Sequence, residues 1–355
     1  MVVCGAWGVA RSDARRRPTF PRRCSSSQVL RLFASRDILS APVFAAGTDA
    51  CRGFVGVDDI LRALLAWAAI ASDPSPAARA EGLRRAGARL HAERVRDIPR
   101  RNDGALLRAR VDGSMSLLEL VRSSFLRDGA APPVHRVAVY DAPDGDDDGD
   151  DDDAAAGAPV RVTAVVSQSD VVAYIARHAP AALGALASIP VGDIEGLASS
   201  PVASVPQGMP AALALASLFQ SDCPVSAAAV VATEGDGPHG ALLADVSVSD
   251  LRGLTPGDVG ALAAPVLDFL ATRHPPPPRS PTGAASAWGV KAPDTERRRD
   301  VGAAAVRFPP GAPLGAVIAA LAATRRHRAY IIDGDGRPDG ILTLTDLLKL
   351  IAREA

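Results

Sequence analysis

The stretch RRHRAYIIDGDGRPDGILTLTDLLKLI, residues 325–351, decides the fold. The apolar segment AYIID is followed by GDGRPDG, in which Gly and Pro supply the backbone angles of a turn. A second apolar segment, ILTL, leads to Asp346 and to LLKLIA, which has the apolar spacing of a helix. Upstream, PLGAVIAALAATRRH has the same helical spacing, and AAVRF before it predicts a short strand that ends at Pro309 and Pro310. The predicted unit is strand, helix, strand, strand, helix, in about sixty residues.

The same unit recurs three more times along the chain. In each copy, two apolar strand segments precede an Asp and a helical segment, and a further helix is expected before them. Unit one is expected to be incomplete, because its leading strand is not convincing and its first helix is short. The copies are ILSAPVFAAGTDACRGFVGVDDILRALLAWA, then PPVHRVAVYDAP with VRVTAVVSQSDVVAYIARHA, then VSAAAVVATEGDGPHGALLADVSVSDLRGL.

These repeats, and the composition of the segments between them, divide the chain into parts. Two segments are expected to be linkers, and the Pro-rich one between units three and four is expected to be a semi-rigid spacer with no core to bury. The parts are an N-terminal leader, 1–27, expected to be disordered; unit one, 28–72; a linker, 73–94; unit two, 95–180, with an acidic loop at 141–157; unit three, 188–254; a helix and Pro-rich linker, 255–300; and unit four, 301–355.

Composition and charge exclude some classes of function. Aromatic residues make up only 4% of the chain, which argues against a stacking surface for single-stranded nucleic acid. The net charge of −1 includes nine Asp between Asp141 and Asp153, and without these the remaining chain would carry +8. The acidic block is expected to be a solvated, disordered loop, with a divalent-cation or basic-partner site as the alternative. The Arg runs ARRRP and ERRRD are expected to be solvated linkers rather than nucleic-acid patches.

Cysteine spacing and hydropathy bear on the compartment. The four cysteines form no C-x-x-C pair, so a zinc site or a disulfide framework is not expected and a reducing compartment fits. No apolar run reaches the ~18 residues that a membrane helix needs, so no membrane association is expected. We expect a cytoplasmic or nuclear protein, with the Arg- and Ser-containing residues 1–27 as the argument for a chloroplast transit peptide instead.

The repeated unit resembles the CBS motif, a paired nucleotide-binding module. The four-motif arrangement resembles the gamma, energy-sensing subunit of AMP-activated and SNF-related protein kinases, in its plant or green-algal form. The resemblance covers residues 28–355 and implies an α/β fold of four CBS motifs in two pseudo-twofold paired modules. It rests on VHRVAVYD in unit two, ADVSVSDLRGL in unit three and RHRAYIIDGDGRPDGILTLTDLL in unit four, with ILSAPVF in unit one in support.

The resemblance implies a non-catalytic regulatory subunit whose ligands are AMP, ADP or ATP and whose partners are the kinase alpha and beta subunits. A nucleoside monophosphate presents an apolar base, a ribose diol and a dianionic phosphate. A carboxylate at a strand-to-helix junction can accept two hydrogen bonds from the diol, and the backbone amides that open the helix lie near the phosphate. His and Arg from a neighbouring strand end can bind the phosphate itself.

Family positions carry over residue by residue. The resemblance implies that Gly56 stands in unit one where the other units have Ser or Thr, and that Leu39 replaces a basic residue before the strand. Both changes weaken the first site. The implied ribose ligands are Asp59, Asp170, Asp250 and Asp346; the hydroxyls three residues earlier are Ser167, Ser247 and Thr343; the phosphate ligands are the pairs His135 with Arg136 and His327 with Arg328.

Each assignment has a structural alternative. An Asp that precedes a helix is a common N-cap, worth ~1 kcal/mol without any ligand, and a surface His-Arg pair is usually only solvated. The sequence has no Walker loop, no G-x-S-x-G, no H-E-x-x-H and no kinase catalytic set, so we expect no enzyme. Two other functions stay open. One is a scaffold of the same fold that binds no nucleotide, and the other is a free-standing CBS regulator of a metabolic enzyme or transporter.

Overall fold

The computed structural model describes most residues of the four repeated units. The predicted leader up to residue 23, the acidic loop 141–157 and the Pro-rich segment 275–304 lie outside the described residues. The structure describes residues 24–44, 51–70, 75–98, 108–110, 115–127, 133–140, 162–178, 182–219, 225–233, 240–274 and 305–354.

Unit four has the element order that the sequence predicts. Its three-stranded sheet has β10 in the centre, paired parallel with β9 and antiparallel with β11. The turn between β10 and β11 forms because Oδ1 of Asp333 accepts hydrogen bonds from the backbone of Asp335 and Arg337, at 2.9 and 2.8 Å. Gly336 follows with φ +78°, a conformation that favours glycine. The elements are β9 (Arg307–Phe308), α10 (Leu314–Thr324), β10 (Arg328–Ile332), β11 (Pro338–Thr343) and α11 (Leu344–Glu354).

Units two and three repeat this topology. In each, the first strand pairs parallel with a central strand, which pairs antiparallel with the last. Unit two contains β3 (Arg108–Arg110), α5 (Leu117–Glu119), the π-helix η2 (Leu120–Phe125), β4 (Arg136–Tyr140), β5 (Val162–Ser167) and α6 (Gln168–Arg177). Unit three contains β6 (Ser204–Pro206), α8 (Ala211–Ser217), β7 (Ala227–Val231), β8 (Leu242–Ser247) and the 3-10 helix η7 (Val248–Leu251).

Unit one has a smaller sheet than the other three units. Within the described residues its sheet has two strands, β1 and β2, and no parallel leading strand. Leu39 precedes β1 and Gly56 ends β2, so both departures from the repeat lie at the strand ends. Its elements are α2 (Ser26–Ser35), β1 (Ser40–Phe44), β2 (Cys51–Gly56) and α3 (Val57–Trp67).

The predicted linker 73–94 is mostly the helix α4 (Pro76–Ala92). Ser75 caps it by accepting a hydrogen bond from the Ala78 amide at 3.1 Å, and Pro76 occupies the first position, where no amide is needed. Leu83 and Leu90 are fully buried, so the helix packs into the core rather than spanning between units. Its neighbours include α3 and the 3-10 helix η8 (Pro256–Ala263), which leads to α9 (Val266–Arg273).

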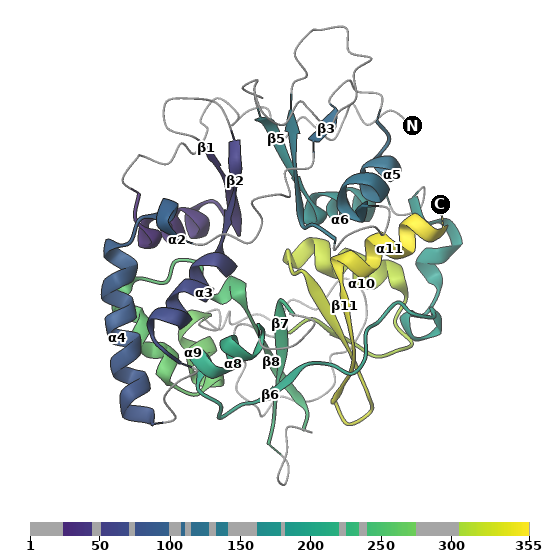
Figure 1. Ribbon diagram of the computed structural model, residues 1–355. Coiled ribbons are helices and arrows are strands. Elements are labelled where there is room, and N and C mark those ends of the chain that lie inside the picture. The colour runs from purple at the N-terminus through teal and green to yellow at the C-terminus, as the bar shows by residue number, and fades with distance from the viewer. Residues whose placement is uncertain are drawn as a thin grey trace, which may run out of the picture.

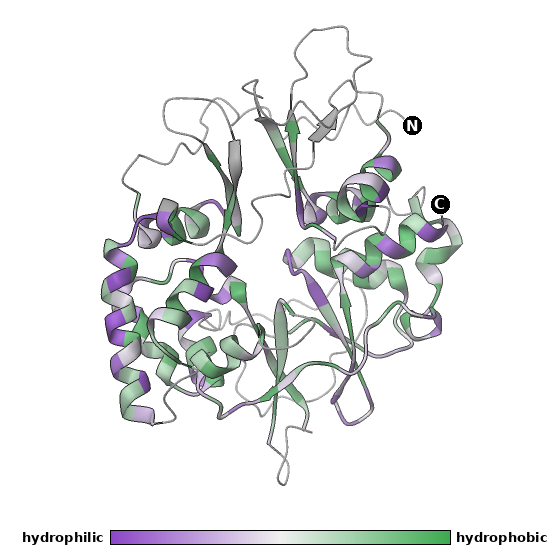
Figure 2. Cartoon of the chain, viewed as in Figure 1, coloured by the Kyte–Doolittle hydropathy of each residue, from purple (hydrophilic) through white to green (hydrophobic). Residues whose placement is uncertain are grey.

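The four units surround a common centre (Figure 1). One hydrophobic core joins unit one with unit three through Leu64 and Leu215, and a second joins unit two with unit four through Val172 and Leu347. The sheets of units three and four meet at Tyr330, and the sheet of unit one lies beside that of unit two. Figure 2 shows hydrophilic and hydrophobic residues alternating along helices such as α4 and α11. The largest cores therefore join units that are not consecutive in the chain, which the expectation of two paired modules did not specify.

Candidate functional site

All four predicted ribose-binding aspartates occupy the third position of their helices rather than the N-cap. The carboxylate of each reaches back to the backbone amide at the end of the preceding strand, as in a capping box. Asp346 Oδ2, for example, accepts hydrogen bonds from the amide and the hydroxyl of Thr343, at 2.9 and 2.6 Å. The equivalent amide bonds join Asp59 to Gly56 (2.9 Å), Asp170 to Ser167 (2.8 Å) and Asp250 to Ser247 (2.7 Å).

Capping uses one carboxylate oxygen, and the second oxygen differs between units. Asp170 is exposed, and its Oδ1 accepts no hydrogen bond from any residue that the structure describes. Asp346 is 14% exposed, and its Oδ1 lies 4.0 Å from Nζ of Lys349. In both Asp170 and Asp346, Oδ2 makes the capping bonds and Oδ1 remains available to accept a hydrogen bond from a hydroxyl. The capping alternative and the ribose assignment are compatible for these two residues.

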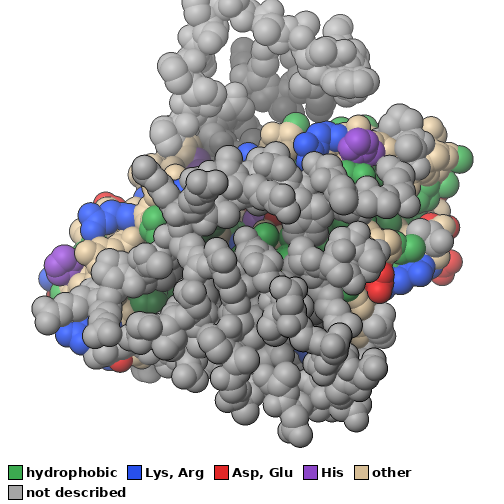
Figure 3. Space-filling model, turned by 90° about the horizontal axis from the view of Figure 1, so that it is seen from above, with side chains coloured by type: hydrophobic (Ala, Val, Ile, Leu, Met, Phe, Trp, Pro, Cys, Tyr) green, Lys and Arg blue, Asp and Glu red, His purple; other side chains and the backbone are tan. Residues whose placement is uncertain are grey.

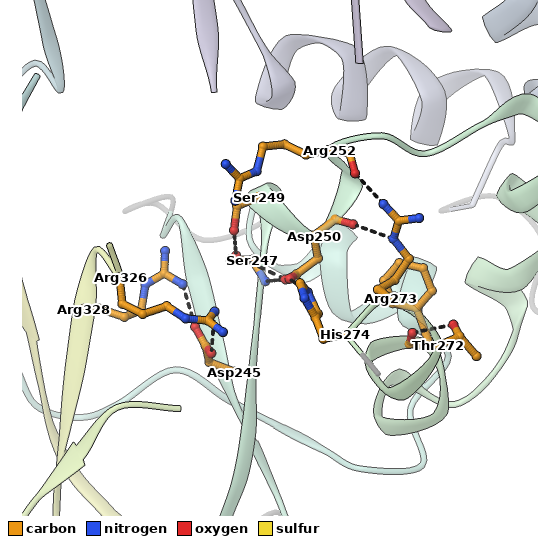
Figure 4. A network of polar contacts seen from close by, with 11 residues as sticks. Asp245, Ser247, Ser249, Asp250, Arg252, Thr272, Arg273, His274, Arg326 and Arg328 are labelled. Carbon is orange, nitrogen blue, oxygen red and sulfur yellow. Dashed lines mark hydrogen bonds and ion pairs between the residues drawn. The ribbon is translucent and has the colours of Figure 1, made fainter. Parts of the chain in front are cut away.

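Asp250 is different because both of its oxygens are bound within the chain. Oδ2 accepts from Ser247, and Oδ1 lies 2.8 Å from Nε2 of His274, at the end of α9 (Figure 4). Arg273 also donates to the backbone carbonyl of Asp250, at 3.2 Å. Asp250 is only 3% exposed. The structure therefore gives the carboxylate of Asp250 a structural role in unit three.

Gly56 leaves room for a neighbouring carboxylate. A Cβ on Gly56 would lie 2.1 Å from Oδ1 of Asp58, so the Asp58 side chain occupies the place of the Ser or Thr side chain in the other units. Asp58 also interacts electrostatically with His135 and Arg136 of unit two. Unit one therefore presents a negative charge toward unit two at this junction.

The two predicted His-Arg pairs come together. Electrostatic interactions connect His327 with Arg328, Arg136, His135 and Arg252, and Arg136 with Arg252. We call these five side chains, which come from units two, three and four, the central basic cluster. Like charges at short range are unfavourable unless anions lie nearby. The cluster therefore has the composition of an anion site.

The cluster changes the protonation of its histidines. Burial, followed by the nearby arginines, lowers the pKa of His327 to about 4. Burial and Arg136 also lower the pKa of His135, although a hydrogen bond that the His135 ring donates to Gln168 and the charge of Asp58 oppose this. Protein atoms surround much of the His135 side chain, and burial is the main cause of its lowered pKa. The residue is nevertheless exposed to solvent, so a ligand can reach it. Both histidines are neutral at neutral pH in this state, and a bound anion would favour their protonation.

Several anionic and hydroxyl partners of the cluster were not predicted. Arg328 donates to Asp245 Oδ2 over 2.7 Å, Arg136 donates to Ser40 Oγ over 2.8 Å, and Arg252 pairs with Asp37. One signal was present in the sequence, since Asp245 is a lone charge in the apolar strand LLADVS. Asp37 and Ser40 carry no such signal, because their partners lie far away in the chain.

Other classes of site find no support in the described part of the chain. It contains no group of three or more His, Cys, Asp or Glu side chains that could hold a metal ion. None of the helices in the described segments is long and apolar enough to cross a membrane. Seen from above, acidic, basic and apolar side chains are interspersed over the described surface (Figure 3).

Comparisons with known proteins agree with this fold. Residues 300–353 match the family model of the CBS domain, so unit four is a CBS domain. No curated protein matches the chain. Among solved structures, the chain is similar to protein MJ1225 of Methanocaldococcus jannaschii, which is described as a proposed archaeal homologue of g-AMPK. The TM-score is 0.53 at 13% identity, with 94% of this chain and 96% of that chain covered.

A second similar structure is an uncharacterized conserved protein of Pyrococcus horikoshii, with a TM-score of 0.43 at 18% identity, covering 88% of this chain and 90% of that one. At 13% identity the likeness to MJ1225 concerns the fold alone. The α/β CBS-domain fold extends across most of the chain.

Proposed function

We propose that this protein is a non-catalytic regulatory subunit that binds AMP, ADP or ATP at the central basic cluster. The observation that carries the proposal is the convergence of cations from three units on one place, with two crowded histidines held neutral. Arg252 and Arg328 already pair with Asp37 and Asp245, whereas Arg136 hydrogen-bonds only the hydroxyl of Ser40. A phosphate dianion would bring a counter-charge to Arg136, and a guanidinium binds phosphate through two parallel hydrogen bonds.

The ribose would be bound by Asp346 or Asp170. In each, one carboxylate oxygen holds the capping box while the other can accept a hydroxyl. The first turns of α11 and α6 add the partial positive charge of their amides near the same place. Asp250 and Asp59 are poorer candidates, because both are 3% exposed and Asp250 has both oxygens bound.

The regulated enzyme we propose is a SNF-related or AMP-activated protein kinase, with this chain as its gamma-like subunit beside alpha and beta subunits. Support comes from the similarity of the whole chain to a protein described as a proposed g-AMPK homologue, and from the sequence resemblance to the plant or green-algal form. The mechanism would be differential binding. A nucleotide that prefers one packing of the four units shifts the equilibrium toward it, by no more than its difference in affinity.

Calorimetric titration of the purified chain with AMP and then ATP tests the nucleotide proposal. We expect saturable binding in the wild type, weakened about 10- to 100-fold by Arg136→Gln, because a charge-assisted hydrogen bond to phosphate contributes about 1.5–3 kcal/mol. Arg94→Gln is the control, since Arg94 is exposed and lies outside the cluster. A folded wild-type chain that gives no heat with any adenine nucleotide would refute the proposal.

A scaffold that binds no nucleotide is the second candidate. It is favoured by the two internal carboxylate contacts, Arg328 with Asp245 and His274 with Asp250, which occupy groups expected to face a ligand. The presence of Leu39 in place of a basic residue also favours a scaffold that binds no nucleotide. The titration separates the two functions. Co-purification from the source cells separates a kinase subunit, which brings alpha and beta chains, from a free-standing CBS regulator, which does not.

A further inference from the structure

The two His-Arg pairs differ in what their arginines bind. Arg328 donates from Nη1 to Oδ2 of Asp245 over 2.7 Å, and the two side chains are 9% and 5% exposed. Arg326 approaches the other oxygen of Asp245 at 4.0 Å (Figure 4). Arg136 instead donates to a neutral hydroxyl, that of Ser40, at 2.8 Å. Arg328 is therefore in direct contact with a carboxylate, whereas Arg136 hydrogen-bonds a neutral hydroxyl. The carboxylates of Asp58 and Asp170 act on Arg136 through electrostatic interaction without a hydrogen bond.

The strand pairing holds Asp245 in this place. Asp245 lies in β8 opposite Ala229 of β7, within a strand whose neighbouring residues Ala244 and Val246 are fully buried. Arg328 begins β10 and lies opposite Thr343, the residue that bonds to Asp346. A buried carboxylate is retained only where a cation compensates its lost hydration. The sheets of units three and four thus bring a carboxylate to the guanidinium next to a predicted nucleotide site.

We propose that Asp245 is an internal counter-anion that occupies the phosphate-binding groups of Arg328, so that Arg136 is the arginine of the two pairs that is open to a ligand phosphate. This inference rests on the proposed function, in that it takes the central basic cluster to be the anion site. Carboxylate and phosphate compete for the same guanidinium donors. A phosphate near Arg328 would also meet the charge of Asp245, and this repulsion is strong where water is excluded.

The consequence is a limit on how many phosphates the centre holds. With Asp245 ionised, the chain is expected to bind one polyphosphate group, at Arg136. Asp245→Asn keeps the volume of the side chain and removes its charge, which leaves Arg328 and Arg326 as cations without a full counter-charge. A second phosphate group should then bind at Arg328.

Calorimetry with inorganic pyrophosphate tests the inference apart from nucleotide recognition. We expect one site per chain in the wild type, lost in Arg136→Gln, and one additional site in Asp245→Asn. The additional site should disappear in the double variant Asp245→Asn with Arg328→Gln. The control is Asp335→Asn, because Asp335 is 73% exposed and pairs with Arg337 in a turn. Circular dichroism confirms that each variant is folded.

Two results would overturn the inference. One is a folded Asp245→Asn protein with the same number of sites and the same affinity as the wild type. The other is a wild type with two pyrophosphate sites, a result that needs no variant to fold. If Asp245→Asn gains a pyrophosphate site while no form of the chain binds AMP, the inference stands and the proposed function fails. If the wild type binds AMP and Asp245→Asn gains nothing, the proposed function stands and the inference fails.

Discussion

The hydroxyl of Thr345 donates a hydrogen bond to Oε1 of Gln168 over 3.1 Å, and this bond joins the first turns of α11 and α6. Gln168 is 3% exposed, and its Nε2 donates to the backbone carbonyl of Val134 at 3.0 Å. The helices that carry Asp346 and Asp170 are thus tied together where both carboxylates lie. A single polar network positions the two best candidate ribose ligands.

Removal of Gln168 should therefore destabilise units two and four together. Gln168→Ala leaves the carbonyl of Val134 without its donor and opens space in a buried position. We expect the free energy of unfolding to fall by about 1–3 kcal/mol, the desolvation penalty of an unsatisfied buried polar group. Urea denaturation measures this value. Ser123→Ala, at an exposed helix position, should change it by less than about 0.5 kcal/mol. Equal effects of the two variants would contradict the network's role.

Replacement by Asn should have different effects at Asp346 and at Asp250. Asp346→Asn should weaken AMP binding about tenfold or more, because its second oxygen is placed to accept a ribose hydroxyl. Asp250→Asn should leave AMP affinity nearly unchanged and lower the melting temperature instead, since it disrupts the contact between unit three and His274 at the end of α9. Calorimetry and thermal melting of both variants check this. Comparable losses of AMP affinity in both would show that Asp250 also binds the ligand.

In unit four the order of helices and strands could be predicted from the sequence alone. Its apolar periodicity, the Gly-rich turn after Asp333 and the Asp at the start of α11 are local features, and they predicted the order of elements correctly. The common register of the four aspartates was also readable, although their exact place at the third helical position was not. Local patterns suffice where the contacts that fix an element lie within a few residues.

Contacts between distant segments could not be predicted in the same way. Arg328 and Asp245 are 83 residues apart, and a strand residue reveals its face but not the unit that this face will meet. The helical nature of α4 was missed because its Arg-rich, Gly-containing sequence has low helix propensity at Gly82 and Gly87. The pairing of unit one with unit three depends on which apolar faces fit together, and four similar repeats offer several such pairings.

The low pKa of His327 predicts a loss of stability in acid. Its pKa in the folded state, about 4, lies below its ordinary value of 6.5, so between these values the unfolded chain binds more protons. The free energy of unfolding is therefore highest above pH 6.5 and falls as the pH drops from 6.5 toward 4. His135 shifts in the same direction. The charged groups that lower the pKa of His327, besides its burial, are Arg328, Arg136 and Arg252.

Denaturation in urea at pH 7.5, 6.0 and 5.0 measures this dependence, and His327→Asn is the variant to compare. The slope between pH 6.5 and 5 should be shallower in the variant than in the wild type. AMP should also cause proton uptake near pH 6, because its phosphate favours protonated His327. Calorimetry in buffers of different ionisation enthalpy detects that uptake. Identical slopes in the wild type and the variant would show that His327 does not cause the loss of stability in acid.

The contact of α4 with the rest of the molecule gives the last prediction. A Cβ on Gly82 would lie 2.3 Å from the carbonyl oxygen of Ala68, and a Cβ on Gly87 would lie 2.5 Å from that of Pro256. Both neighbours are backbone atoms, which cannot rotate away. Gly87→Ala would gain about 1 kcal/mol of helix propensity. It should nevertheless lower the free energy of unfolding by about 1–3 kcal/mol, because the helix must move away from η8.

Gly260→Ala is the matched control, because Gly260 lies in η8 itself and nothing would come within 4 Å of its Cβ. This variant should be neutral or stabilise by up to about 1 kcal/mol, since Ala has fewer conformations to lose on folding. Urea denaturation of the two variants beside the wild type gives both values. A Gly87→Ala protein as stable as the wild type would mean that α4 does not pack closely on η8, and the segment 73–94 would then be the simple linker that its composition predicts.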